Sequence, residues 1–168
     1  ERSIDKWMIS QLNLHIKEAT EALEVFQTRQ ALQHALFLLK KDVDHYTYRI
    51  RPSIDKQDPA VIYVLSTVLD NWIRLLAPFT PHTCEELWST YGGEGFASEA
   101  AWPEYDESLI DSEIEASEDL VQNIVKDIKE IKNIVDKESE KVHIYLAPEW
   151  KWELYRIADE VGKPDVGQ

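Results

Sequence analysis

The sequence has little of what cysteine chemistry, metal binding or membrane insertion would require. Its single cysteine, Cys84, excludes an internal disulfide and a cysteine-rich zinc site. No uninterrupted apolar run approaches the length of roughly 20 residues that a membrane-spanning helix needs, and no charged-then-apolar leader is visible. These absences are typical of a soluble protein in a reducing compartment, so we expect a cytoplasmic location and no membrane partner.

Positive charge is also scarce. The chain carries 18 Lys and Arg against 32 Asp and Glu, which gives a net charge of −14. Because affinity for phosphates depends on Lys and Arg that release counterions, this balance argues against an indiscriminate nucleic-acid binder. Residues 29–56 depart from this acidic balance, because they contain six Lys or Arg against three Asp. Such a local basic surface is typical of RNA contact, and an ordinary solvated helix face is the alternative.

The composition and periodicity predict a mainly α protein. Its 168 residues are 43% hydrophobic and include six Trp and seven Tyr, enough for a packed core without a covalent staple. Apolar residues recur at steps of three and four, which predicts helices in residues 4–26, 32–50, 59–75, 81–91, 114–135 and 150–161. We predict that the first four form an antiparallel bundle, with residues 94–110 wrapping it as an irregular segment.

The pattern changes near the C-terminus. Residues 141–147 alternate between apolar and polar side chains, which predicts a half-buried strand between two helices. We therefore expect two domains, a helix bundle in residues 1–110 and a small, truncated α/β unit in residues 111–168. A lone strand cannot satisfy its backbone hydrogen bonds, so its partner strands are expected outside this sequence. The first residue, Glu1, likewise suggests a fragment of a longer chain.

The stretch "LAPFTPHTCEELW" (residues 76–88) holds the strongest candidates for chemistry. His82, Cys84 and Glu86 are spaced by two, so on a helix they point about 200° apart and cannot share an ion or form a nucleophilic pair. His82 and Glu86 are spaced by four and could share an ion, but two ligands do not make a metal site. Thr80-Pro81 instead has the pattern of a helix start, so we predict no metal site and no catalytic residue here.

The glycines of residues 92–95 are the other candidate. A phosphate-binding loop follows a strand and opens a helix, whereas these glycines close one. A helix terminator is therefore the better interpretation.

The same motifs resemble a known family. Residues 76–88 followed by Trp102-Pro103 resemble the helical anticodon-binding domain of class I aminoacyl-tRNA synthetases for Leu, Ile, Val and Met. Residues 4–10, "IDKWMIS", are similar to the start of that domain, with Lys6 where Arg is usual. "GGEGF" (residues 92–96), "AWPE" (101–104), "VKDIKEI" (125–131) and "HIYLAPEWKW" (143–152) look most like the archaeal type of leucyl-tRNA synthetase.

The resemblance implies an activity for the whole enzyme and a role for this region. The whole enzyme would esterify leucine to its tRNA with ATP and Mg²⁺ in a catalytic domain that carries "HIGH" and "KMSKS" motifs. Neither motif occurs here, so this region would bind tRNA without a cofactor and without catalysis. Leucyl enzymes are expected to use tRNA shape, including the long variable arm, more than the anticodon bases. The partners would be a leucine-accepting tRNA and the rest of the synthetase chain.

Two sets of residues follow as candidates. The motif residues would serve the structure of the family: Pro78, Pro81, His82, Glu85, Glu86, Trp88 and Trp102. Cations that could hold phosphates and aromatics that could stack on a base are the tRNA-binding candidates: Arg29, Lys40, Lys41, Tyr48, Arg49, Arg51, Lys56 and Trp150. For each of these, a solvated charge or a core aromatic is the alternative.

Two other functions remain open from the sequence. One is the same domain of an isoleucyl, valyl or methionyl enzyme, of which the isoleucyl and methionyl enzymes would read the anticodon directly. The other is a helical protein-interaction module whose acidic surface meets a basic partner; this alternative predicts no RNA binding even at low salt.

Overall fold

The computed structural model describes residues 2–54, 58–135 and 141–161, and these residues are organised in helices without any strand. The chain divides into two units, residues 1–123 and 124–168. The elements in chain order are α1 (Ser3–Glu24), α2 (Thr28–Leu32), the π-helix η1 (Gln33–Leu38), α3 (Leu39–Ile54), α4 (Pro59–Leu76), α5 (Pro81–Tyr91), the 3-10 turns η2 (Ala97–Glu99) and η3 (Glu107–Leu109), α6 (Ser112–Val135) and α7 (Glu149–Val161).

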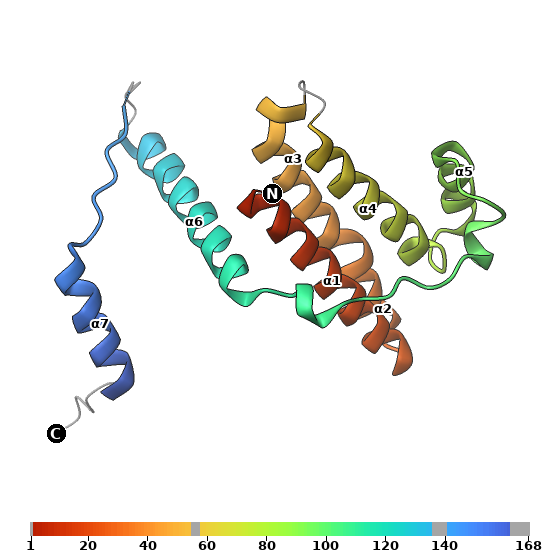
Figure 1. Ribbon diagram of the computed structural model, residues 1–168, viewed down its shortest axis with the longest axis horizontal. Helices are drawn as coiled ribbons and strands as arrows, with labels where there is room; N and C mark the ends of the chain where they lie inside the picture. The colour runs from red at the N-terminus through yellow and green to blue at the C-terminus, as the bar shows by residue number, and fades with distance from the viewer. Residues whose placement is uncertain (1, 55–57, 136–140, 162–168) are drawn as a thin grey trace. The chain divides into compact units, whose positions relative to one another are not determined.

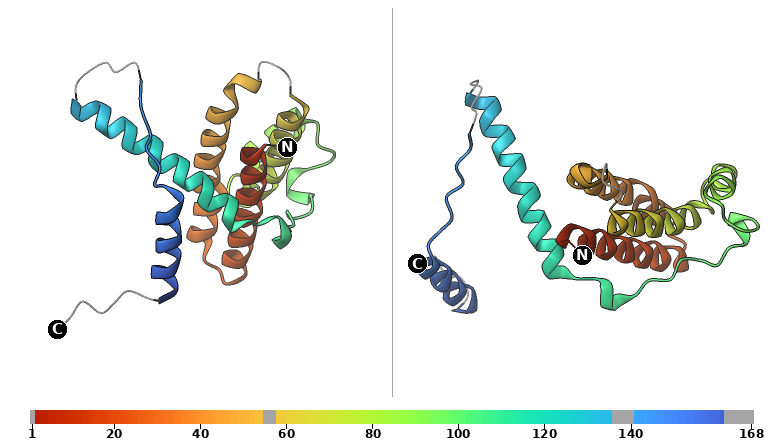
Figure 2. Two further views of the ribbon diagram at one scale, coloured as in Figure 1. Left: turned by 60° about the vertical axis from the view of Figure 1, so that its left-hand side comes forward. Right: turned by 45° about the horizontal axis from the view of Figure 1, so that its top comes forward.

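The main core lies between α1, α3 and α4, which run side by side, with α3 antiparallel to both α1 and α4 (Figures 1 and 2). Each helix contributes the apolar stripe that its sequence predicts, because side chains three and four positions apart share one face. The largest buried side chains include Trp7, Met8, Leu12, Leu39 and Tyr46. The prediction of a mainly helical protein is therefore confirmed, and three of the four helices predicted for the bundle form its core.

Helix α5 is not a fourth member of this core, although its sequence pattern predicts one. It packs against the end of α4 and against η2, where a second, smaller cluster is formed by Ile73, Ala77, Cys84, Trp88 and Ala97. The reason is the short α4–α5 junction, in which Pro78 and Pro81 redirect the chain after a few residues. Figure 1 shows α5 beyond the end of α4 rather than along the bundle.

The expected strand at residues 141–147 is absent: residues 141–148 carry no strand or helix, and the prediction of an α/β unit is wrong for the described residues. A strand needs a neighbour for its backbone hydrogen bonds, and no described segment provides one. Its apolar residues face solvent for the most part, since Ile144 is 59% exposed and Leu146 is 78% exposed. The helix predicted after it is present as α7.

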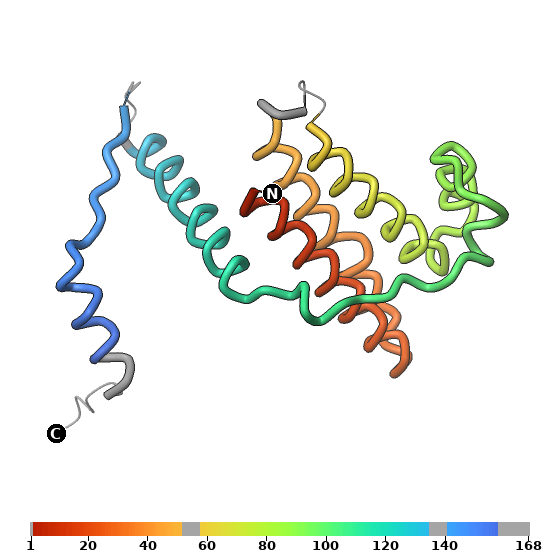
Figure 3. Tube along the Cα trace, in the orientation of Figure 1, coloured from red at the N-terminus to blue at the C-terminus, as the bar shows by residue number. Residues whose placement is uncertain are grey.

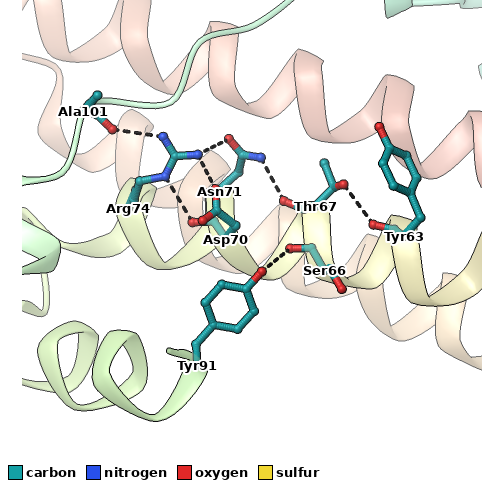
Figure 4. A network of polar contacts seen from close by, with 8 residues as sticks. All are labelled: Tyr63, Ser66, Thr67, Asp70, Asn71, Arg74, Tyr91 and Ala101. Carbon is teal, nitrogen blue, oxygen red and sulfur yellow. Dashed lines mark hydrogen bonds and ion pairs between the residues drawn. The ribbon is translucent and has the colours of Figure 1, made fainter. Parts of the chain in front are cut away.

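Helix α4 is, by length and composition, apolar enough to cross a membrane. Packing explains part of this composition, because Val61, Val64, Val68 and Leu75 are buried in the bundle. Most polar side chains of α4 bond within the helix, as Figure 4 shows for Thr67 with the Tyr63 carbonyl and Asn71 with the Thr67 carbonyl. There Arg74 binds Asp70 and donates to the Ala101 carbonyl at 3.0 Å, and the Tyr91 hydroxyl donates to the Ser66 carbonyl at 3.3 Å.

Residues 92–111, here called the strap, connect α5 to α6 and run antiparallel along α1 (Figure 3). Polar side chains of α1 hold the strap in this position. The Thr20 hydroxyl accepts from the Trp102 indole at 2.9 Å, Asn13 Oδ1 accepts from the Asp106 amide at 2.8 Å, and Ser10 Oγ accepts from the Asp111 amide at 2.8 Å. These bonds explain why α1 buries Ser10 and Asn13, and they agree with the wrapping segment that the sequence predicts.

A buried carboxylate joins α1 to α3. Asp5 is fully buried and accepts the Tyr46 hydroxyl at 2.8 Å and the Arg2 amide and Nε at 3.1 Å each. Burial by itself would raise the pKa of Asp5, but the hydrogen bonds from Arg2 and Tyr46 outweigh it and hold the pKa below its usual range. Burial and the bond to Asp5 raise the pKa of Tyr46 well above its ordinary value. Asp5 is therefore a fixed negative charge in the folded protein.

We expect Asp5→Ala to lower the free energy of unfolding by about 1–3 kcal/mol, because the buried Tyr46 hydroxyl loses its acceptor. Since folding lowers the pKa of Asp5, its stabilisation is present above its unfolded pKa of about 3.9 and is lost as the pH falls through the folded value. Urea unfolding at a series of pH values should therefore show a steeper acid loss in the wild type than in Asp5→Asn. Equal pH dependence in the two proteins would contradict this account.

Gly93 lies against the Trp88 indole: a Cβ at position 93 would be 2.1 Å from Trp88 Cε2. We expect Gly93→Ala to lower the free energy of unfolding by about 1–3 kcal/mol, because the buried indole has to move. Glu94→Ala is the matched control, since Trp88 bonds only to the backbone carbonyl of Glu94. Thermal unfolding of both variants measures the difference, and equal midpoints would show that the indole adapts without cost.

Candidate nucleic-acid interface

Helix α2, the π-helix η1 and α3 follow one another without a break, so residues 28–54 form one helical column. A π-helix bonds residue i to residue i+5, which makes its turns wider than those of the flanking α-helices. At this point Trp72 of α4 donates its indole N–H to the Ala35 carbonyl at 2.7 Å. The column is thus held to the core at the wide turn, while its opposite side is left to solvent.

A second polar contact links the wide turn to α1. His15 is buried, with Nε2 2.8 Å from Asp42 Oδ2 and Nδ1 3.2 Å from His34 Nδ1. Burial, together with the neighbouring His15, lowers the pKa of His34. The sequence alone does not place these histidines together, because 19 residues separate them. This contact fixes the rotation of the column about its own axis.

The exposed side of α3 carries half of the predicted tRNA-binding residues: Lys40, Lys41, Tyr48 and Arg51. At 100° per residue, Lys40, Lys41, Asp44, Tyr48 and Arg51 fall within an arc of roughly 100° around the helix. All five are exposed, whereas Leu39, Tyr46 and Ile50 on the other side are buried. We call these five residues the outer face.

Three of the four charged groups on the outer face are cations. Lys40 is paired with Asp44, with Nζ 2.5 Å from Oδ2. Arg51 lies over the Tyr48 ring, with the guanidinium carbon 5.6 Å from the ring centroid. Within the described residues neither Lys41 nor Arg51 forms an ion pair with a carboxylate. These two cations are therefore available to phosphate oxygens, and Tyr48 presents an aromatic surface beside one of them.

Arg49 occupies a different position, at the flank of α3. Its Nη2 is 3.4 Å from Glu118 Oε2 of α6, and the other oxygen of Glu118 is 2.7 Å from His45 Nε2. Glu118 is only 5% exposed. A nearly buried carboxylate thus already occupies Arg49, which makes Arg49 less available to a phosphate than Lys41 or Arg51.

The other predicted residues are Arg29, Trp150 and Lys56. Arg29 lies on α2, near the start of the same column, and is exposed. Trp150 lies on α7 in the second unit, where Lys151 Nζ is 5.5 Å from its ring centroid. Lys56 lies outside the described residues.

Sequence reasoning missed Phe37, which is 63% exposed on the same column. Its signal was present, because Phe37 lies one position off the apolar stripe that runs through Leu36 and Leu39. Phe37 is therefore a further exposed aromatic ring on the column that carries the candidate residues.

The family-motif residues build the junction between α4, α5 and the strap. Pro81 begins α5, and the Glu85 carboxylate accepts the amides of Ala97 and Ser98 at 2.8 and 2.9 Å. These bonds, that from Ser98 foremost, lower the pKa of Glu85. Trp88 is buried, and Trp102 bonds to Thr20.

Other motif residues have no contact of this kind. Pro78 lies in the turn after α4, and His82 and Glu86 are exposed on α5. Cys84 faces inward, with Sγ 3.4 Å from Thr80 Oγ1. His82 and Cys84 therefore point in different directions, as their spacing of two predicts. No group of three or more ligand-type side chains suited to a metal ion is found in the described part of the chain.

The chain is similar to curated leucine–tRNA ligases. It is 52% identical over 167 residues to that of Methanothermobacter thermautotrophicus, which covers 99% of this chain and 18% of the relative. It is 44% identical over 160 residues to that of Pyrococcus abyssi, covering 95% of this chain and 16% of the relative. The chain therefore spans less than a fifth of the length of these relatives.

A solved structure is similar as well. It is the LeuRS of Agrobacterium radiobacter K84, crystallised in a ternary complex with tRNA and LeuAMS. The TM-score is 0.55 at 28% identity, over 66% of this chain and 13% of that chain.

The family model described as the anticodon-binding domain of tRNA ligase matches residues 5–146, which is most of the chain. Taken with the helical bundle and the identity to curated relatives, this match shows that the chain belongs to the anticodon-binding domain family of tRNA ligases and corresponds to that region of the leucine–tRNA ligases.

Proposed function

We propose that this chain is the tRNA-docking region of a leucine–tRNA ligase and that the outer face of α3 contacts the tRNA backbone. The observation that carries the proposal is the pair of exposed cations, Lys41 and Arg51, which have no carboxylate partner among the described residues. In a chain of net charge −14, such a face is the part best suited to phosphate oxygens. The similar LeuRS was crystallised together with tRNA, which supports the same class of partner.

Within this proposal the residues of the column have different tasks. Lys41 and Arg51 bind phosphates directly, and Lys40 does so after leaving Asp44. Tyr48 orients Arg51 or stacks on a base, and Phe37 extends the aromatic surface. Arg29, Arg49, Lys56 and Trp150 remain proposed contacts, with Arg49 contributing least because it is bound to Glu118.

The acidic remainder of the chain supports selectivity. Carboxylates on the other surfaces repel phosphate, so RNA that does not match the outer face gains little from the chain as a whole. The proposal therefore combines a small number of phosphate contacts with a low background affinity.

The rest of the activity is assigned to the remainder of the ligase. Joining leucine to tRNA with ATP and Mg²⁺ would take place in a catalytic domain outside this chain, in a cytoplasmic enzyme. Residues 1–110 would form the docking bundle, and residues 111–168 would begin a C-terminal extension that also binds tRNA. The docking region would hold the tRNA so that its acceptor end reaches the catalytic domain.

We expect Lys41→Ala and Arg51→Ala each to weaken binding of a leucine tRNA transcript. Each should also reduce the slope of log affinity against log salt by about one. The reason is that a variant with one phosphate contact fewer releases fewer counterions when it binds. Fluorescence anisotropy over a salt series measures both quantities. Lys6→Ala is the matched control, since it removes the same charge from an exposed position on α1. An equal effect of all three variants would show that net charge, rather than the outer face, determines binding.

The identity of the RNA is tested in the same assay. We expect deletion of the variable arm to weaken binding and an anticodon mutation to leave it unchanged, because a leucyl enzyme is expected to use tRNA shape. Binding that follows the anticodon would favour an isoleucyl or methionyl enzyme. Absence of binding at low salt would contradict RNA docking by this chain and favour a protein-interaction module.

A further inference from the structure

The turn between α1 and α2 holds a residue in an unfavourable backbone conformation. Phe26 has φ +60°, the only positive φ of a non-glycine residue in the described part of the chain. Its amide donates to the Leu23 carbonyl at 3.0 Å, and the Gln27 amide donates to the Ala22 carbonyl at 2.8 Å. These two bonds define a Schellman motif, in which Phe26 occupies the left-handed position that glycine usually takes.

Packing of the Phe26 side chain within the fold does not offset the cost of this left-handed backbone conformation. A residue with a Cβ is disfavoured in the left-handed region, and an aromatic residue has no polar group that could bond locally. The ring is nevertheless 90% exposed. Because strained residues persist where function requires them, a strained and solvent-exposed aromatic ring indicates a contact with another molecule.

The surroundings of the turn favour RNA as that molecule. Arg29 lies three residues further on, is exposed, and has no ion-pair partner among the described residues. The turn also leads directly into the column that carries the outer face. Val25 is exposed beside Phe26, and Glu21 and Glu24 are exposed on the preceding turns of α1. With these carboxylates nearby, the turn cannot attract RNA by charge alone, so an uncharged stacking contact is the interaction that it can offer.

We propose that Phe26 stacks on an unpaired base of bound RNA while Arg29 contacts a phosphate next to it; this rests on the tRNA docking proposed above. Aromatic side chains bind unstacked bases through their faces, and an adjacent guanidinium adds a contact to the backbone. A ring held outward by the backbone loses little conformational freedom when a base stacks on it. The left-handed conformation is therefore what aims the ring at the RNA.

The test compares Phe26→Gly and Phe26→Trp with the wild-type 168-residue chain. Glycine adopts the left-handed conformation without strain, so Phe26→Gly should raise the thermal unfolding midpoint. The same variant should bind the tRNA transcript about tenfold more weakly, because the stacking contact is lost. Its salt slope should stay unchanged, since stacking releases no counterions. Phe26→Trp should keep the affinity of the wild type or increase it.

Two controls isolate the stacking contact. Phe96→Ala removes another exposed aromatic ring, 63% exposed on the strap, and should leave binding unchanged. A fully paired RNA duplex offers no unpaired base, so the wild type and Phe26→Gly should bind it equally.

The outcomes separate this inference from the docking proposal. If Lys41→Ala and Arg51→Ala reduce the salt slope but Phe26→Gly binds like the wild type, only the stacking inference is wrong. A loss of affinity for the paired duplex equal to that for tRNA also overturns it, as does a lower unfolding midpoint in Phe26→Gly, which would show that the ring packs within the fold. If the wild type binds no tRNA at low salt, both proposals fall.

Discussion

The fully buried carboxylate of Asp5 sets how α1 and α3 can pack against each other. It accepts hydrogen bonds from Arg2 at the start of α1 and from Tyr46 in the middle of α3. A buried charge without these partners would be strongly unfavourable, and Tyr46 is the partner from α3, so the two helices can pack only where Tyr46 reaches Asp5. Together with the contact of His15 to Asp42, this fixes the side of α3 that faces the core and therefore the side that faces solvent.

The outer face follows from this packing. With Tyr46 and Ile50 directed inward, the helical period places Lys41, Tyr48 and Arg51 outward. Two acidic residues described near this side are already bound: Asp44 to Lys40, and Glu118 to His45 and Arg49. A strongly acidic chain can therefore present a small cationic surface, because local pairing, not total charge, decides what a phosphate meets.

Polar groups on α1 have a comparable role on another side of the bundle. Ser10, Asn13 and Thr20 would be unfavourable in an apolar core, yet each binds the strap. The strap has little regular structure of its own, so these side chains supply the partners that its backbone and its Trp102 indole need. The motif residues Glu85 and Trp88 act in the same way at the α5 end of the strap, where Glu85 accepts the Ala97 amide and the Trp88 indole donates to the Glu94 carbonyl.

The positions of the helices could be predicted from the sequence, because apolar spacing and the Asp-Pro and Thr-Pro starts are local signals. The family could also be predicted, because its motifs lie together at the junction of α4, α5 and the strap. The basic character of α3 could be predicted from its sequence as well. Tertiary packing was needed to show that α5 stands apart from the main core, that residues 141–147 form no strand, and that Glu118 binds Arg49. It was also needed to reveal Phe37 and Phe26 as exposed aromatics. Apart from Phe37, whose position beside the apolar stripe is visible in the sequence, these features depend on contacts between distant residues or on a single backbone angle. Neither of these leaves a periodic pattern in the sequence.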